Sequence, residues 1–310
     1  MKTKLIVLLL TLLSGFVYAQ QDAQYSQYMY NTIVINPAYA GSRDALSIFA
    51  LHRTQWVGLD GAPVTNSVSI NTPINGSNVG LGVSIVNDRI GPSDENNVAV
   101  DISYFIPTSE RYRLSFGIKA TANLLNVDFT KLNIYNPSDP RYVDNIDNKL
   151  SPNIGAGIYL HSDNTYFGLS IPYFLETNHF DKGANYTTAS TFIAKERLHY
   201  YFIAGHVFDL STNVKFKPSV LSKIVKGSPF QLDISANLLI NEKFTAGVAY
   251  RWDAAVTALF GFQTSNSWFI GYGYDFDTTK LANFNSGSHE IFLRYELFKK
   301  NNRLLSPRFF

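Results

Sequence analysis

Apolar and polar residues alternate through most of this chain, and the clearest example lies at residues 230–276. In residues 230–238 every second position is apolar, and the positions between them are polar or small. The same alternation returns in residues 244–252, 256–262 and 268–276. Because successive side chains on a β-strand point to opposite faces, each stretch predicts a strand with one apolar face. Their short connections predict an up-and-down antiparallel sheet.

The same pattern, followed along the whole chain, predicts fourteen strands. They span residues 44–52, 63–72, 78–87, 97–107, 111–123, 152–161, 165–173, 198–210, 213–224, 229–240, 243–253, 255–264, 267–276 and 288–298. No stretch after Ala19 is apolar for long enough to predict a membrane-spanning helix. The chain is therefore expected to be all-β.

Residues 1–19 predict a secretory signal peptide. Lys2 and Lys4 precede an apolar stretch at residues 5–13, and Ala19 ends a small-residue cleavage site. The apolar stretch is shorter than the roughly 20 residues that a membrane-spanning helix needs. We therefore expect an exported mature chain that begins at Gln20.

The composition narrows the class of protein. Loss of Lys2 and Lys4 takes the formal charge from +2 to 0, which argues against a nucleic-acid partner. The absence of cysteine excludes disulfides, thiolate metal sites and cysteine nucleophiles. Charged residues make up 16% of the chain, against about 25% in typical soluble domains. A chain of this kind is either a large β-sandwich or a closed barrel whose apolar face meets lipid.

The lengths of the predicted connections separate these two architectures. All even-numbered connections are short, and the long ones, residues 53–62, 88–96, 124–151, 174–197 and 277–287, are all odd-numbered. Two odd-numbered connections, one of them residues 225–228, are also short. Outer-membrane barrels have short periplasmic turns and longer extracellular loops, whereas a sandwich has no reason to sort connections in this way. We predict a 14-stranded antiparallel transmembrane outer-membrane β-barrel at residues 44–298, followed by a periplasmic tail at residues 299–310.

The polar faces of these strands predict a charged lumen. Alternation places Ile118 and its apolar equivalents against lipid, and it points these charged residues inward: Asp101, Lys119, Asp233, Arg251, Asp275 and Arg294. One interpretation is a hydrated lumen with compensating charges, and the other is a binding site. Together with Arg53, Gln55 and Trp56 of the first loop, the six charged residues are our candidate partner-binding residues. An arginine beside a tryptophan is typical of interface anchors, although simple packing at the rim remains the alternative.

A fourteen-stranded wall encloses more space than its own side chains fill, so it needs a plug or conducts. The segment before the first strand, residues 20–43, is the candidate lumen plug or brace. Its aromatic and conformationally restricted residues are the candidate plug residues: Tyr25, Tyr28, Tyr30, Asn36, Pro37 and Tyr39.

Two N-terminal blocks carry a family resemblance. The first is QDAQYSQYMYN at residues 21–31 with INPAYAGS at residues 35–42, and the second combines Arg53, Gln55 and Trp56 with GAP at residues 61–63. Both resemble the PorP/SprF family, and the ending SPRFF at residues 306–310 is similar to the family's usual ending. The resemblance implies an outer-membrane barrel of Bacteroidota that is associated with type IX secretion and gliding motility.

The resemblance also implies partners. It implies a secreted surface protein, such as an adhesin with its own C-terminal sorting domain, which the barrel exports or retains. Outer-membrane lipid is expected around the wall, and the outer connections 124–151 and 174–197 with the upper lumen are expected to bind the partner. The basic tail, with Lys299, Lys300, Arg303 and Arg308, is a candidate contact for periplasmic secretion or motility components, or simply a solvated end.

No motif in the sequence predicts catalysis or a cofactor. The six histidines lack metal-ligand spacing, and no GxSxG motif is present. Our hypothesis is a non-enzymatic barrel that receives and anchors a secreted protein at the cell surface. One alternative is a transport channel for small or hydrophobic solutes, and another is a lipid-modifying enzyme with a lipid-facing Ser–His pair.

Overall fold

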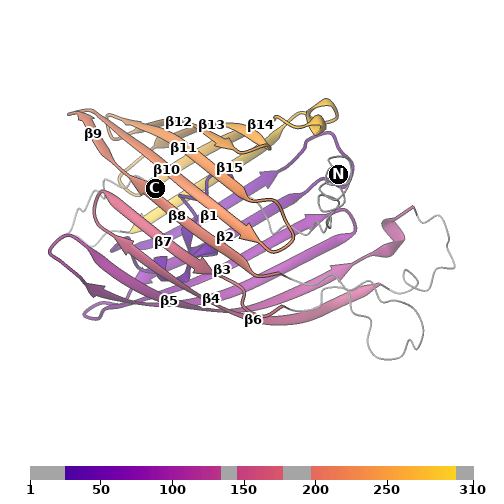
Figure 1. The fold of residues 1–310 in the computed structure, drawn as a ribbon, viewed down its shortest axis with the longest axis horizontal. Helices are drawn as coiled ribbons and strands as arrows, with labels where there is room; N and C mark the ends of the chain where they lie inside the picture. Colours follow the sequence, from indigo (N-terminus) through magenta and orange to yellow (C-terminus); the bar gives the residue numbers. More distant parts are fainter. Residues whose placement is uncertain (1–24, 134–144, 177–196, 298–310) are drawn as a thin grey trace, which may run out of the picture.

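The computed structural model describes residues 25–133, 145–176 and 197–297 (Figure 1). The strands of these residues form one antiparallel sheet that follows the order of the chain and closes where β15 pairs with β1. Closure leaves the sheet without free edges, so the wall satisfies its own backbone hydrogen bonds, as a membrane interior requires. The predicted signal peptide and the predicted C-terminal tail lie outside the described residues.

The wall has the predicted number of strands. Its segments are β1 Leu46–Thr54, β2 Val64–Pro73, β3 Val79–Ile90, β4 Ser93–Pro107, β5 Arg113–Val127, β6 Ile146–His161, β7 Thr165–Ile171, β8 His199–His206, β9 Phe208–Ser211, β10 Val214–Val225, β11 Gln231–Ile240, β12 Phe244–Arg251, β13 Ala255–Gln263, β14 Trp268–Asp277 and β15 Ser288–Leu297. Both β8 and β9 pair with β10, so they are two parts of one strand and the described wall has fourteen. The break between them lies near Pro218 of β10, which has no N–H to donate to the ladder.

Side chains alternate between the two faces of the wall, and this confirms the predicted parity. Ile118 is 68% exposed on the outer face, while the next residue, Lys119, is 1% exposed inside the lumen. The outer face of the neighbouring strands is equally apolar, with Val83, Val100 and Ile158 exposed. No helix among the described residues is long and apolar enough to cross a membrane.

The two ends of the barrel differ in their connections. One end, here called the short-turn end, has tight turns such as residues 162–164 between β6 and β7. The other, the long-loop end, carries the connections 128–145 and 172–198, together with the short helices η2 Phe129–Lys131 and η3 Lys280–Asn283. In the outer-membrane architecture, the short-turn end faces the periplasm.

The prediction of a long connection at residues 88–96 is wrong. β3 continues to Ile90 and β4 begins at Ser93, so a two-residue turn joins them. β5 and β6 also continue into the predicted loop 124–151, and these strands reach beyond the rest of the long-loop end (Figure 1). Residues 88–96 are mostly polar and partly buried, so no apolar alternation marks those strand ends. The extended ends of β5 and β6 instead carry a small buried apolar cluster of Leu125, Val127, Phe129 and Ile146.

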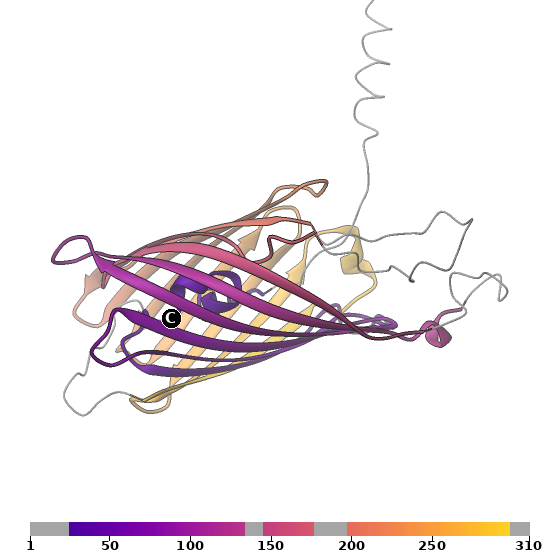
Figure 2. The same ribbon diagram turned by 90° about the horizontal axis from the view of Figure 1, so that it is seen from below.

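Residues 25–42, here called the luminal segment, lie inside the barrel (Figure 2). Nearly all of them are buried, although their only regular structure is the short helices α2 Thr32–Ile35 and η1 Pro37–Tyr39. The largest buried apolar cluster of the described residues joins this segment to the wall, with Tyr30 stacked on Phe269 and close to Phe292. The core of this protein is therefore the interior of the barrel.

Candidate functional site

The filled lumen is the candidate functional site, because the luminal segment and most of the charged wall residues meet there. Residues 36–42, the lower part of the segment, contact strand positions near the short-turn end. Residues 25–31, the upper part, begin near the long-loop end, where Ser26 meets Asp275 and Glu290, and descend to Tyr30, which packs on Phe269. Residues 32–35 connect the two parts through α2. The two parts are held by different kinds of interaction.

Glycines on the wall receive the lower part. A Cβ atom added at Gly117 of β5 would overlap the backbone nitrogen of Ala38, and one at Gly80 of β3 would overlap the carbonyl oxygen of Ala40. The absence of side chains at these positions therefore lets the backbone of the segment lie directly against the sheet. Glycines at these wall positions therefore provide the space that the lower part occupies.

Polar groups complete the attachment of the lower part. Asn36 donates from Nδ2 to the carbonyl oxygen of Ile158 at 3.1 Å, and Ser103 Oγ donates to the carbonyl oxygen of Ala40 at 2.7 Å. Just past the segment, Arg43 donates from Nη2 to Glu296 Oε2 at 2.9 Å. These contacts fix the segment where the chain leaves it to enter β1.

Neutral and charged contacts meet at the middle of the segment. Asn31 donates from Nδ2 to Ser67 Oγ and accepts from Ser69 Oγ, each at 3.1 Å. Lys119 Nζ lies 2.8 Å from Asp101 Oδ1 and donates to the carbonyl oxygen of Ile33 at 3.2 Å. The buried pair of Lys119 and Asp101 is thereby directed at the backbone of the segment.

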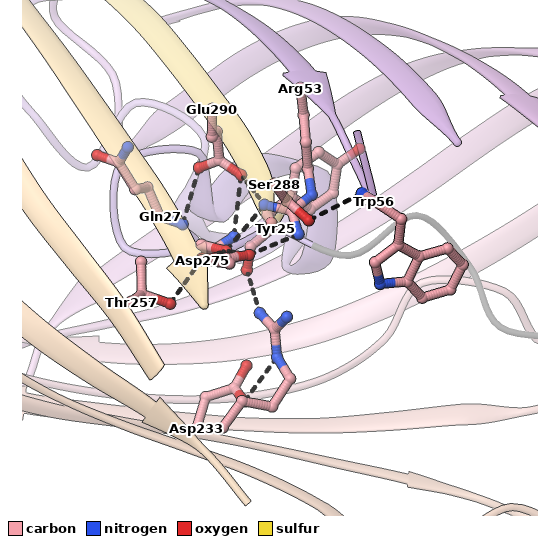
Figure 3. Close-up of polar contacts among 12 residues, drawn as sticks. Tyr25, Gln27, Arg53, Trp56, Asp233, Thr257, Asp275, Ser288 and Glu290 are labelled. Carbon is pink, nitrogen blue, oxygen red and sulfur yellow. Dashed lines mark hydrogen bonds and ion pairs between the residues drawn. The ribbon is translucent and has the colours of Figure 1, made fainter. Parts of the chain in front are cut away.

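A network of charged side chains holds the upper part (Figure 3). Glu290 accepts from the backbone nitrogens of Ser26 and Gln27, both at 3.0 Å. Arg53 lies between two carboxylates, with Nη2 2.7 Å from Asp275 and Nη1 3.2 Å from Glu290. Ser26 joins them, since its Oγ donates to Asp275 at 2.7 Å and accepts from Arg53 at 2.9 Å.

A second arginine extends this network across the lumen. Arg251 Nε lies 3.0 Å from Asp233 Oδ1, and Arg251 Nη2 donates to the carbonyl oxygen of Tyr25 at 3.2 Å. Thr257 Oγ1 donates to Asp275 at 2.7 Å. The five charged groups that surround Tyr25 and Ser26 come from β11, β12, β14, β15 and β1. We call Arg53, Asp233, Arg251, Asp275 and Glu290 the upper charge cluster.

The ring of Tyr30 in the segment contacts two further cations of the lumen, Arg294 and Lys217. The guanidinium of Arg294 lies 5.8 Å from the ring centre of Tyr30 and 5.1 Å from that of Phe269. Lys217 Nζ lies 5.5 Å from the ring centre of Tyr30. At such distances the ring face attracts the cation, which stabilises positive charge in an otherwise apolar layer.

The structure accounts for the candidate partner-binding residues in two ways. The charged candidates contact the luminal segment or one another: Arg53, Asp101, Lys119, Asp233, Arg251, Asp275 and Arg294. Gln55 and Trp56 instead lie at the rim, where the backbone nitrogen of Trp56 donates to Ser288 Oγ at 3.1 Å. The loop beyond them pairs with the connection before β15, through Val57 and Gly287 at 2.9 Å, and its tip is exposed.

The candidate plug residues all lie in the lumen and are buried: Tyr25, Tyr28, Tyr30, Asn36, Pro37 and Tyr39. Sequence reasoning missed Ser26, Arg43, Glu290 and Glu296 as contacts of this segment. Parity alone places Glu290 and Glu296 on the luminal face of the last strand, so a signal for them was present. The pairing of Ser26 with Asp275 has no such signal, because it depends on the path of an irregular segment.

An open cavity of about 260 Å³ lies at the long-loop end, where the extended ends of β4, β5 and β6 meet. Asp94, Asp128 and Lys131 are among its lining residues. The hydroxyl of Thr130 donates to Asp128 at 2.6 Å and lowers the pKa of that carboxyl below its ordinary value. The cavity offers mixed charge to the outside.

The described residues show no arrangement for metal chemistry. No group of three or more histidine, aspartate or glutamate side chains within them could hold a metal ion. Histidines outside the lumen form other pairs: His52 with Asn66 at 2.8 Å, His206 with Thr165 at 2.6 Å, and His289 with Tyr272 at 2.6 Å.

Comparison with known proteins gives a family and a fold. The family model "Type IX secretion system membrane protein PorP/SprF" matches residues 17–295. No curated protein sequence matches the chain. Among solved structures, a TodX ΔS2S3 mutant monoaromatic hydrocarbon channel is similar at a TM-score of 0.50 and 9% identity, over 91% of this chain and 96% of that one. The CymD monoaromatic hydrocarbon channel has a TM-score of 0.48 at 13% identity, over 91% and 95% of the two chains.

Proposed function

The chain belongs to the PorP/SprF family of type IX secretion system membrane proteins, and from this premise we propose that it anchors a secreted protein at the cell surface. In this proposal the barrel is non-enzymatic and sits in the outer membrane. Its partner is a surface protein exported by the type IX system, such as a gliding adhesin, and it binds through the C-terminal sorting domain of that protein. Periplasmic components of the secretion or motility apparatus are further partners.

The observation that carries this proposal is the filled lumen. Residues 25–42 occupy the interior, and the charged wall residues are engaged with that segment or with each other. A conducting pore needs a continuous water path, and paired buried charges around a packed segment do not provide one. A closed barrel in a secretion family is better suited to holding a protein than to passing solutes.

The long-loop end is the surface on which the partner is proposed to dock. The extended strands β4, β5 and β6 stand above the rest of this end, and the open cavity near Asp128 lies among them. Exposed apolar side chains occur on the same projection, including Leu132 and Leu150. Apolar side chains beside polar rims are typical of protein interfaces.

Purification from native outer membranes tests the proposal. The affinity-tagged full chain is extracted in mild detergent, and mass spectrometry identifies the proteins retained with it. We expect one dominant secreted protein with a C-terminal sorting domain, and we expect its recovery to fall when residues 130–144 are replaced by a two-residue turn. The same preparation from an unrelated tagged barrel is the control, and the absence of any specifically retained secreted protein contradicts the proposal.

A transport channel is the second candidate, and the likeness to the TodX structure favours it at the level of the fold alone. Planar bilayer recordings separate the two functions. We expect no steady conductance from the full chain, whereas a chain without residues 25–42 conducts because the interior is emptied. A steady open conductance of the full chain would replace anchoring by transport.

A further inference from the structure

We propose that the upper lumen is a binding site for a second polypeptide, a short turn-forming segment that takes the place of residues 25–27. The incoming segment uses the same main-chain contacts with the upper charge cluster. This inference rests on the proposed function, because the segment belongs to the anchored protein.

The upper charge cluster recognises main chain. Glu290 accepts from two consecutive backbone nitrogens, those of Ser26 and Gln27, and Arg251 donates to the carbonyl oxygen of Tyr25. Every polypeptide carries these groups, so the contacts do not depend on the identity of the occupant. Carboxylates and guanidinium groups make stronger hydrogen bonds to such partners than neutral side chains do.

One side chain of the occupant is specified. Ser26 is buried, and its hydroxyl lies between Asp275 at 2.7 Å and Arg53 at 2.9 Å. A larger residue has no room there, and an alanine would leave both charged groups with one contact fewer. The expected ligand is therefore a segment with a serine-sized hydroxyl residue.

The resident segment satisfies this site incompletely. Within the described part of the chain, the buried Nε2 of Gln27 and the buried Nε of Arg53 have no hydrogen-bond partner. A buried polar group without a partner destabilises the state that contains it. An incoming segment that supplies acceptors for these two groups has an advantage over residues 25–27.

Residues 25–27 are able to leave while Tyr28, Tyr30 and the lower part stay packed in the lumen. The lower part has its own attachments, namely the close backbone packing at Gly80 and Gly117 and the hydrogen bond from Ser103. The stretch 25–27 belongs to no strand or helix, so its departure breaks no regular element. It also lies toward the long-loop end, the end that an extracellular partner reaches.

Peptide binding to the full chain tests the inference. Ser26→Phe expels the resident residues 25–27 and vacates the site, and a fluorescein-labelled peptide of residues 21–27 is the probe in detergent micelles. We expect anisotropy to show saturable binding at least about tenfold tighter than to the wild type, in which the resident segment competes. Glu290→Gln in the same background is expected to weaken binding at least about tenfold, since the fork for two backbone nitrogens is lost.

Glu296→Gln in the Ser26→Phe background is the matched control. It makes the same glutamate-to-glutamine change on the same strand, β15, but beside the lower part of the segment. We expect it to leave peptide binding unchanged. A labelled peptide that itself carries Ser26→Phe is expected not to bind. Heat-dependent mobility on gels confirms that each barrel is folded, and a chain without residues 20–27 serves if Ser26→Phe does not fold.

Equal peptide binding by the wild type and by Ser26→Phe would overturn the inference, as would unchanged binding in Glu290→Gln. Retention of the native partner by full-length Glu290→Gln at the wild-type level would also overturn it while leaving the anchoring function intact. Loss of that partner in Glu290→Gln but not in Glu296→Gln supports the inference. Absence of a partner from the wild-type preparation counts against the anchoring function alone, since the peptide measurement stands by itself.

Discussion

The lower and upper parts of the luminal segment are fixed to the same wall by opposite means. The lower part is held by shape, because wall glycines such as Gly117 leave room for its backbone and neutral groups such as Ser103 bond its carbonyls. The beginning of the upper part is held by charge, through Arg53, Asp275 and Glu290 around Ser26. The attachment of the lower part is rigid. The attachment of the upper part depends on buried charged groups, each of which needs an oppositely charged or hydrogen-bonding partner.

The two kinds of attachment contribute differently to stability and to recognition. Close backbone packing admits only one occupant and adds stability without adaptability. Buried ion pairs add little net stability compared with apolar packing, yet the loss of one member is severe because an uncompensated charge stays behind. The lower part therefore anchors the segment, and the upper part is suited to recognition.

The largest effect is expected from Arg53→Met in the upper charge cluster. The substitution leaves Asp275 and Glu290 buried without their shared cation, and we expect the free energy of unfolding to fall by about 3–5 kcal/mol. Arg113→Met is the matched control, because Arg113 pairs with Asp44 at the surface and its side chain is 42% exposed. Its loss is expected to be about 0–1 kcal/mol. Urea titration in detergent measures both, and equal losses would contradict the assignment of a buried network.

Gly117→Ala tests the rigidity of the lower attachment. The new methyl group would overlap the backbone of Ala38, which has no freedom to move aside, so we expect a loss of about 1–3 kcal/mol. Gly273→Ala is the comparison in the upper part, where the nearest atoms are the side-chain ends of Gln27 at 3.0 Å and Leu259 at 3.4 Å. We expect about 0.5 kcal/mol or less for it. A larger loss from Gly273→Ala would reverse the roles of the two parts.

Ser103→Ala isolates one neutral hydrogen bond of the lower attachment. Removal of the hydroxyl leaves the buried carbonyl of Ala40 without its donor, and we expect a loss of about 1 kcal/mol in the same urea titration. If the free energy of unfolding fell as much as in Arg53→Met, neutral and charged contacts would hold the segment equally.

The smallest effect is expected outside the lumen, at Thr130 and Asp128. Thr130→Val removes the hydroxyl that lowers the pKa of Asp128, so this pKa is expected to rise toward its ordinary value. The stabilisation that Asp128 gives its turn is present above the ordinary pKa of aspartate and is lost as the pH falls through the lowered value. A carboxyl titration followed by NMR measures the pKa, and no change in it would contradict the proposed role of Thr130.

Alternation was sufficient to predict the wall because lipid imposes one apolar face on every strand. It predicted the strand number, and it predicted that Lys119 and Asp101 face inward. It failed at residues 88–96, where Asp88 and Asn96 belong to paired strands whose side chains are mostly polar and partly buried. In that region nothing forces an apolar pattern, so the sequence of a strand looks like that of a loop.

The contacts within the lumen were less accessible to sequence reasoning. The charged residues were found by parity, but whether Arg53 meets Glu290 or an outside partner depends on what fills the space between them. The route of residues 25–31 has no periodicity, because its hydrogen bonds are made with side chains of distant strands. Burial of an irregular segment is a property of the closed wall and cannot be seen in the segment alone.

The seam where β1 meets β15 has a consequence for assembly. Arg53 and Glu290 are paired across this seam, and both form hydrogen bonds with Ser26 of the luminal segment. Pairing of β1 with β15 therefore also brings Arg53 and Glu290 together around Ser26. A sheet that shut with its final pair slipped by a residue would turn these side chains toward lipid and release the segment. The contacts of Ser26 with both strands therefore depend on the β1–β15 register that the structure shows.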